Sequence, residues 1–164
     1  MKTLYLLRHA TSASATPPQM SDYDRTLSAT GVREARSIGR YMQMNRMLPD
    51  FVLSSSAVRT TQTAQIVMDA LFGKMAATVA NNFDKDLYQA PDEKILSAIQ
   101  AAAPAQRSLM MVGHNPGIGE LAFLLGKIEH YEPGTLSVFS ADCESWAEFS
   151  PRTVKLEKVF VPEG

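Results

Sequence analysis

Basic side chains follow three short apolar runs of the sequence, at the points where those runs end. Arg8 and His9 come directly after the first run. Arg59 follows the second run across a short polar stretch, and His114 follows the third run after one glycine. Arginine matches phosphate oxygens with a planar fork of N–H donors, and histidine can act as a nucleophile. Four such groups in a chain of net charge −1 predict a local site for an anionic ligand, most simply a phosphoryl group.

The three apolar runs, residues 3–7, 51–53 and 109–112, are predicted to be strands of a parallel sheet. Each run is short and bounded by polar or turn residues, as is typical of strands buried on both faces. Ligands of open α/β sheets bind beyond the carboxyl ends of the strands, so the sheet would bring the basic side chains to one rim. Any single one of these basic residues could equally well be an ordinary surface cation. That interpretation is a poor one for the basic residues at all three strand ends together.

Segments with helical periodicity separate the predicted strands. A first helix is expected to begin after Ser28 as its N-cap, and a second is expected over 57–72. A third is expected to open at Pro91, whose fixed φ suits a first helical turn. A fourth is expected to have Asn115 as its N-cap and to end before Gly126. Strands that alternate with helices predict a layered α/β fold with a mainly parallel sheet.

The rest of the chain is typical of one soluble domain over residues 1–164, because no linker-like composition divides it. Residues 134–140 and 145–149 are expected to form a late antiparallel pair or a sheet edge, and 11–18 a flexible loop. Sixteen basic and seventeen acidic residues exclude a strongly basic surface for nucleic acid. The first apolar run is too short for a signal or membrane segment, and the lone Cys143 favours a reducing, cytoplasmic location.

Several sequence blocks resemble the histidine phosphatase superfamily, in order and at fitting spacing between residues 4 and 117. They are LRHA at 7–10, LSATG at 27–31, SSSAVRTTQTA at 54–64 and VGHNPG at 112–117. Ala10 after the Arg-His pair, the DRTL sequence at 24–27 and the small size are most similar to SixA-type phosphohistidine phosphatases. The resemblance implies a three-layer α/β/α fold of the phosphoglycerate mutase-like kind.

The resemblance also implies a metal-independent phosphatase without a cofactor, in which neutral His9 attacks phosphorus and becomes phosphorylated. A backbone carbonyl that accepts from the other ring nitrogen would fix the reactive tautomer. Arg8, Arg59 and a protonated His114 would hold the phosphoryl oxygens and offset charge in the transition state. Arg25, at a matching motif position, would add a phosphate or substrate contact, and pairing with a neighbouring aspartate is an equally good alternative.

No residue of the sequence is an obvious general acid. Asp22, Asp24 and Asp86 are the candidates, although most such loop carboxylates are simply solvated. Phosphomonoesterases of the superfamily usually carry an acid that protonates an alkoxide leaving group, whereas an imidazole nitrogen is easily protonated without one. The missing acid therefore favours a phosphoramidate substrate over an alkyl ester.

The sequence thus predicts an enzyme that removes phosphate from phosphohistidine in proteins. A phosphatase for small esters such as sugar phosphates is the first alternative, and a phosphate-binding relative without turnover is the second. The four intact basic residues disfavour the second alternative. Only residues 80–90 are available to build a lid, and an open site suits a phosphorylated protein better than a small metabolite. No metal site is expected, because the histidines at 9, 114 and 130 lack the spacing of metal ligands.

Overall fold

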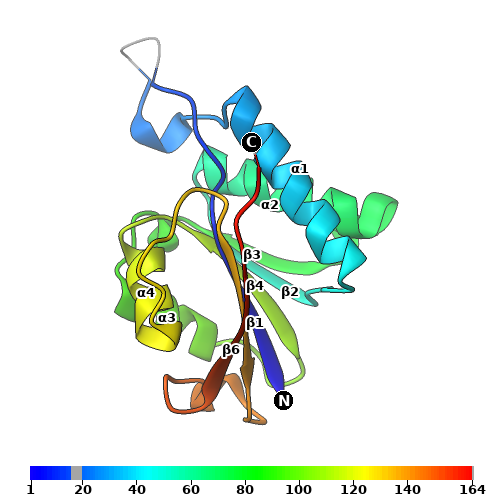
Figure 1. Ribbon diagram of the computed structural model, residues 1–164, viewed down its shortest axis with the longest axis vertical. Helices are drawn as coiled ribbons and strands as arrows, with labels where there is room; N and C mark the ends of the chain where they lie inside the picture. Colours follow the sequence, from blue (N-terminus) through cyan, green and yellow to red (C-terminus); the bar gives the residue numbers. More distant parts are fainter. Residues whose placement is uncertain (16–19, 164) are drawn as a thin grey trace.

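The computed structural model describes residues 1–15 and 20–163. Its centre is a six-stranded sheet with the strand order β3-β2-β4-β1-β5-β6 (Figure 1). Neighbouring strands from β3 to β1 are parallel, and β5 pairs antiparallel with both β1 and β6. The strands are β1 (Lys2–Arg8), β2 (Phe51–Ser55), β3 (Ala80–Asp84), β4 (Ser108–Gly113), β5 (Leu136–Ala141) and β6 (Val154–Phe160). The α/β fold with a mainly parallel sheet is therefore confirmed.

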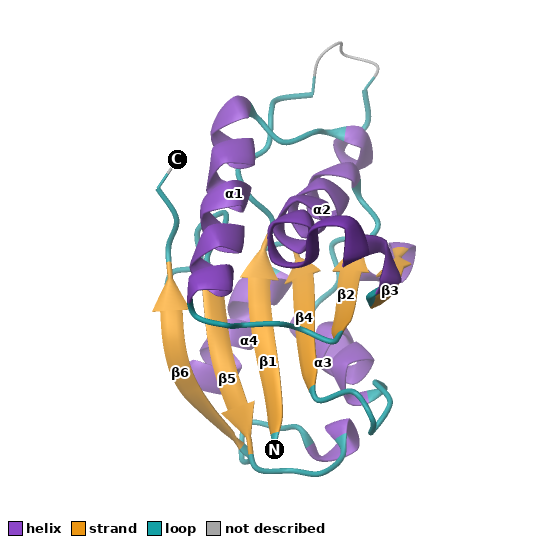
Figure 2. Ribbon diagram, turned by 90° about the vertical axis from the view of Figure 1, so that its right-hand side faces the viewer, coloured by secondary structure: helices purple, strands orange, loops and turns teal. Residues whose placement is uncertain are grey.

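Helices form a layer on each face of the sheet. One layer is α1 (Ala29–Met44) with α2 (Val58–Phe72), and the other is α3 (Asp92–Gln100) with α4 (Gly117–Gly126) (Figures 1 and 2). Alternate residues of β1 enter the two layers: Leu4 and Leu6 belong to the core under α3 and α4, whereas Tyr5 and Leu7 belong to the core under α1 and α2. Because β1 is buried on both faces, its sequence is a continuous apolar run instead of an alternating one.

The start of α1 fixes the chain that follows β1. Ser28 is the N-cap, as expected, and its side-chain oxygen accepts from the backbone N–H of Gly31 at 3.0 Å. The backbone N–H of Ser28 donates to the Thr11 carbonyl at 3.0 Å. A Cβ on Gly31 would lie 1.9 Å from the same carbonyl oxygen, so only glycine allows α1 to approach this closely. The segment after His9 is thereby held against the first turn of α1.

Two boundaries differ from those expected at α4. Pro116, not Asn115, is the N-cap, and the Asn115 side chain instead accepts from the backbone N–H of Gly119 at 3.0 Å. Gly126 is the last helical residue, and Lys127 after it takes the positive φ of 58° that ends the helix. Both boundaries of α4 thus lie one residue later than expected, whereas Asn115 still accepts from an N–H group of its first turn.

The strand expected at 145–149 is wrong, because Trp146–Glu148 forms a 3₁₀ turn and the edge strand is β6. Trp146 and Phe149 are both fully buried in the same core. Three residues apart, they would face opposite sides of a strand, whereas a helical turn brings both to one side. Burial of two large aromatic side chains therefore decides the local structure here.

The edge strand β3 was not expected at all. Its first residues, Ala80 to Asn82, are exposed, so it carries no apolar run that would mark a strand. β3 pairs parallel with β2 and leads through the 3₁₀ turn Lys85–Leu87 to the same end of the sheet as β1 and β4. Residues 80–90 therefore contribute a sheet strand and part of the rim, and not only a short lid.

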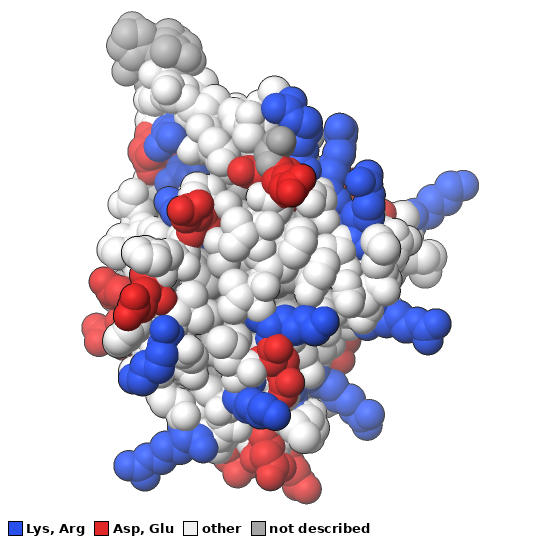
Figure 3. All heavy atoms as spheres, in the orientation of Figure 1, with Lys and Arg blue, Asp and Glu red and all other residues white. Residues whose placement is uncertain are grey.

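The segment expected to be a flexible loop, 11–18, is described only in part. Residues 16–18 of that loop lie outside the described part, and Ser12 forms an isolated antiparallel bridge with Leu27. On the face shown in Figure 3, acidic and basic side chains are interspersed apart from a basic group at the α1 side. No helix within 1–15 or 20–163 has the length and apolar character needed to cross a bilayer.

Candidate active site

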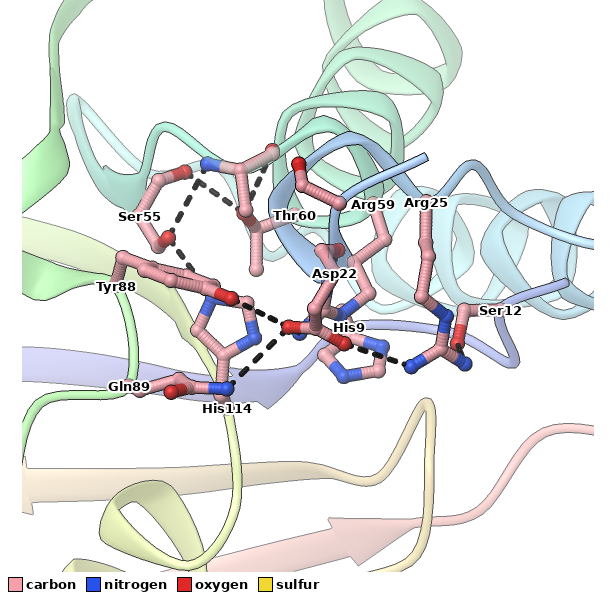
Figure 4. A network of polar contacts seen from close by, with 12 residues as sticks. His9, Ser12, Asp22, Arg25, Ser55, Arg59, Thr60, Tyr88, Gln89 and His114 are labelled. Carbon is pink, nitrogen blue, oxygen red and sulfur yellow. Dashed lines mark hydrogen bonds and ion pairs between the residues drawn. The ribbon is translucent and has the colours of Figure 1, made fainter. Parts of the chain in front are cut away.

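The carboxyl ends of β1 and β4 place both histidines at one rim of the sheet. His9 follows β1 and His114 follows β4, and their ring centroids lie 5.3 Å apart (Figure 4). The backbone N–H of His9 donates to the Gly113 carbonyl at 3.1 Å, which fixes the two strand ends together. Arg8 ends β1, and Arg59 lies in the first turn of α2. Burial and the nearby Arg59 both lower the pKa of Arg8. The chain thus brings these four basic residues together, as their positions after the strands predict.

The ring of His9 is held in one tautomer. Its Nδ1 lies 2.7 Å from the carbonyl oxygen of Ala10, and a carbonyl can only accept, so Nδ1 carries the proton. The lone pair therefore belongs to Nε2. His9 is 6% exposed. Burial is the main cause that lowers its pKa to about 4, and the charges of Arg59 and Arg8 lower it further, whereas the hydrogen bond to Ala10 raises it. His9 is neutral at neutral pH, which is the state that a nucleophile requires.

Burial sets the charge of His114 in the site without substrate. Burial lowers its pKa to about 3, with further contributions from His9 and Arg59, so the ring is neutral without substrate. The protonated His114 expected from the sequence concerns the ring while it holds phosphoryl oxygens, and it stays a prediction. Its Nε2 lies 2.8 Å from the Ser55 hydroxyl, and its Nδ1 is buried without a partner in the described chain. An incoming phosphoryl dianion would favour the charged form again, because an opposite charge at short range raises the pKa of a histidine.

Arg25 and Arg59 meet at one carboxylate, that of Asp22. Arg59 donates to the backbone carbonyl of Asp22 at 2.7 Å and to its Oδ2 at 3.0 Å. Arg25 donates to Oδ1 at 2.9 Å, and its other N–H groups bond to Ser12 and to the Ala13 carbonyl. Pairing with an aspartate, one of the two alternatives for Arg25, is thus observed, and the pair lies beside Arg59 in the rim.

Asp22 has the wrong protonation state for a general acid in this structure. A hydrogen bond from Tyr88 at 2.5 Å, then bonds from Arg25 and Arg59, hold the pKa of its carboxyl group well below the usual range. Such a carboxylate is ionised, so it accepts hydrogen bonds and has no proton to donate to a leaving group.

The other two candidate acids lie away from the histidines. Asp24 is exposed and accepts from the Ser21 hydroxyl at 2.8 Å. Asp86 is exposed in the 3₁₀ turn after β3. Neither side chain contacts His9 or His114 in the part of the chain that the structure describes.

Three residues at the site, Tyr23, Tyr88 and Gln89, were missed by the sequence analysis. Tyr88 donates to Asp22 and packs edge-on against the ring of His114, with centroids 5.4 Å apart. Gln89 donates to the same carboxylate at 3.3 Å. Tyr23 makes a second edge-on contact with Tyr88, at 5.1 Å. These residues follow β3 or belong to the loop before α1, and no strand signal in the sequence marks β3 as a neighbour of the site.

The lowered pKa values of both histidines predict a loss of stability in acid. An unfolded histidine titrates near 6.5, whereas His9 and His114 titrate near 4 and 3 when folded. Between those pH values the unfolded chain binds more protons than the folded chain. The free energy of unfolding therefore keeps its full value above about pH 6.5 and decreases as the pH falls below it. At about pH 4.5 each histidine is expected to cost roughly 2–3 kcal/mol. Urea unfolding at pH 7 and at pH 4.5 measures this loss.

Matched variants assign that loss to its source. His114→Asn is expected to lose roughly 2 kcal/mol less than the parent over this pH interval. His130→Asn, which replaces an exposed histidine, is expected to lose as much as the parent. Equal losses in the parent and in His114→Asn would show that burial does not depress the pKa of this ring.

Comparisons with known proteins agree with this geometry. The family model described as histidine phosphatase superfamily (branch 1) matches residues 4–83, a range that includes Arg8, His9, Arg25 and Arg59. An uncharacterized chloroplastic protein of Arabidopsis thaliana is 30% identical over 175 residues, which cover 99% of this chain and 79% of that protein.

Solved structures extend the similarity over nearly the whole chain. A candidate phosphohistidine phosphatase SixA from Agrobacterium tumefaciens is 29% identical with a TM-score of 0.81, and the match covers 98% of each chain. The corresponding candidate from Nakamurella multipartitia is 26% identical with a TM-score of 0.79, over 98% of this chain and 96% of that one. On the sequence blocks, the arrangement of the sheet and these matches, the chain belongs to the histidine phosphatase superfamily and is of the SixA type.

Proposed function

We propose that the chain is a phosphatase that hydrolyses phosphohistidine in proteins through a phosphorylated His9. The observation that carries this proposal is the hydrogen bond from Nδ1 of His9 to the Ala10 carbonyl. It leaves the lone pair on Nε2 of a neutral ring, within a cluster that contains Arg8, Arg59 and His114. A neutral nucleophile surrounded by cations suits attack on a negatively charged phosphoryl group.

Two buried polar atoms support an anionic ligand. Nε of Arg8 and Nδ1 of His114 have no partner in the described chain. Buried polar groups in folded proteins nearly always have partners, so such atoms at a rim of cations are expected to bind a ligand. Phosphoryl oxygens would supply the missing acceptors, and a proton taken up by His114 beside that dianion would turn Nδ1 into a donor.

The proposed reaction has two steps. In the first, Nε2 of His9 forms a bond to phosphorus while the bond from phosphorus to the leaving group breaks, and the leaving nitrogen takes up a proton from solvent. In the second, a water oxygen bonds to phosphorus, the bond to Nε2 breaks and returns its electron pair to the ring, and the protons of the water leave with the phosphate or pass to solvent. Arg8, Arg59 and His114 hold the phosphoryl oxygens in both steps, so the proposed chemistry needs no metal ion or cofactor.

The phosphohistidine substrate follows from what lies around the nucleophile. Asp22 is a low-pKa carboxylate, and Asp24 and Asp86 are exposed and make no hydrogen bond to either histidine within the described residues, so an alkoxide would leave without help. The rim also opens toward solvent at Asp22, whose side chain is 39% exposed, and at the exposed Gln89. Such an opening suits a phosphorylated side chain of a partner protein. We also propose a cytoplasmic location, in keeping with the single, unpaired Cys143.

The leaving group separates this function from hydrolysis of small esters. Phosphohistidine and aryl phosphates are expected to react at least about a hundredfold faster in kcat/KM than sugar phosphates, because a positioned acid contributes 10²–10⁴-fold to poor leaving groups. Initial rates on a phosphohistidine protein, an aryl phosphate and a sugar phosphate, all in excess chelator, measure the ratio. His9→Ala on each substrate shows whether one site acts on all.

Efficient hydrolysis of the sugar phosphate would favour the small-ester phosphatase instead. Phosphate binding without turnover of any of the three substrates would favour the non-catalytic alternative.

A further inference from the structure

The carboxylate of Asp22 occupies a set of donors that a phosphoryl group would use. Oδ1 accepts from Arg25 at 2.9 Å, and Oδ2 accepts from Arg59 at 3.0 Å. Tyr88 and Gln89 donate to the same Oδ2, at 2.5 and 3.3 Å. Figure 4 shows this carboxylate in the middle of the network, between Arg25, Tyr88 and Gln89. One anionic side chain of the protein therefore gathers the donors of an anion site.

The carboxylate satisfies only part of this site. It offers two oxygens, and its contacts leave Nε of Arg8 and Nδ1 of His114 buried without partners in the described ranges. A phosphoryl group has three non-bridging oxygens and a larger charge, so it can engage these two nitrogens as well as Arg59. The two anions would lie against the same Arg59 guanidinium, and the repulsion between them makes each disfavour binding of the other.

The segment that carries Asp22 contributes no residue to the core. Asp22–Asp24 is a single 3₁₀ turn that contains no buried residue. Its contacts with Tyr88 and Gln89 are side-chain hydrogen bonds, the first partly buried and the second exposed, which water can replace at small net cost. Arg59 also donates to the backbone carbonyl of Asp22, and the Tyr23 hydroxyl bonds to Ser56. When the carboxylate leaves, the hydroxyl of Tyr88 and the amide of Gln89 become free donors beside the site.

We infer that Asp22 is an internal competitor for the phosphoryl site and thereby a specificity-determining residue. This inference rests on the proposed function. Free phosphate and small phosphorylated molecules must displace the carboxylate with phosphoryl contacts alone, so Asp22 weakens their binding. A phosphorylated protein brings further contacts that offset the displacement. The same competition speeds release of the phosphate product.

Binding of inorganic phosphate, measured by isothermal titration calorimetry, tests the inference without turnover. Asp22→Asn is expected to bind phosphate about tenfold more tightly than the parent. This gain corresponds to a parent protein in which the carboxylate occupies the site in about nine of ten molecules. Asp22→Ser, which removes both charge and reach, is expected to show the same gain. Asp24→Asn removes the same charge from the same turn. Within the described residues the Asp24 side chain hydrogen-bonds to Ser21 and to no group of the site, so the phosphate affinity of this variant is expected to change less than about twofold.

The outcomes separate this role from the proposed function. Equal phosphate affinity in the parent and both Asp22 variants, or weaker binding in those variants, would overturn the role of Asp22 as a competitor. A similar gain in Asp24→Asn would also overturn it, because general charge would then explain the effect. Absence of phosphate binding in the parent and in all variants would overturn the phosphatase function itself.

Discussion

Replacing His9 with alanine is expected to lower kcat by roughly 10⁶-fold, the scale seen when a covalent nucleophile is removed. The reason lies in the geometry of one ring. Its Nδ1 proton is bound by the Ala10 carbonyl and its pKa is lowered to about 4, so Nε2 is the unprotonated nitrogen near the arginines. No other described side chain in the site combines a free lone pair with this setting and a fixed tautomer.

Labelled substrate provides the direct measurement. Brief exposure of the parent protein to a phosphoryl donor labelled with radioactive phosphate should leave label that is lost in acid and stable in alkali, as expected for phosphohistidine. His9→Ala should carry no label. His130→Ala, which removes an exposed histidine outside the site, should be labelled like the parent. Acid-stable label, or label retained in His9→Ala, would show that another residue is the nucleophile.

Replacing Arg59 with alanine is expected to lower kcat/KM by about 10²–10³-fold, the scale for a removed transition-state donor. Arg59 is only 4% exposed, and it lies close enough to His9, Arg8 and His114 to lower the pKa of each. Its loss would also weaken the hold on Asp22 and so reduce the internal competition, but the lost donor outweighs this gain. Arg8→Ala and His114→Ala are expected to have effects of similar size.

Steady-state kinetics with a phosphohistidine protein and an aryl phosphate measure these losses. Arg59→Lys keeps the charge but not the planar fork, so its rate should lie between those of the parent and Arg59→Ala. Arg36→Ala, on the exposed side of α1, is the control and should act at the parent rate. Thermal unfolding should show that all variants fold. A near-parent rate in Arg59→Ala would remove this residue from the site.

Much of this protein was determined by the sequence alone. The strands β1, β2 and β4 were predictable because burial on both faces requires continuous apolar runs. The start of α1 was predictable because the cap formed by Ser28 is a local contact. The meeting of His9 and His114 followed from the same cause, since parallel strands that begin at one edge of a sheet end at the other.

Tertiary structure decided the features that depend on distant neighbours. The polar edge strand β3 and the 3₁₀ turn at Trp146 are set by pairing and burial, which local sequence does not encode. Tyr88 meets Asp22 across 66 residues of sequence, and this contact turns a candidate acid into a low-pKa carboxylate. His114 is neutral without substrate because its packed surroundings remove water and add nearby cations. Residue types and spacing determined which groups meet, whereas desolvation and partners within the folded chain decided their charge.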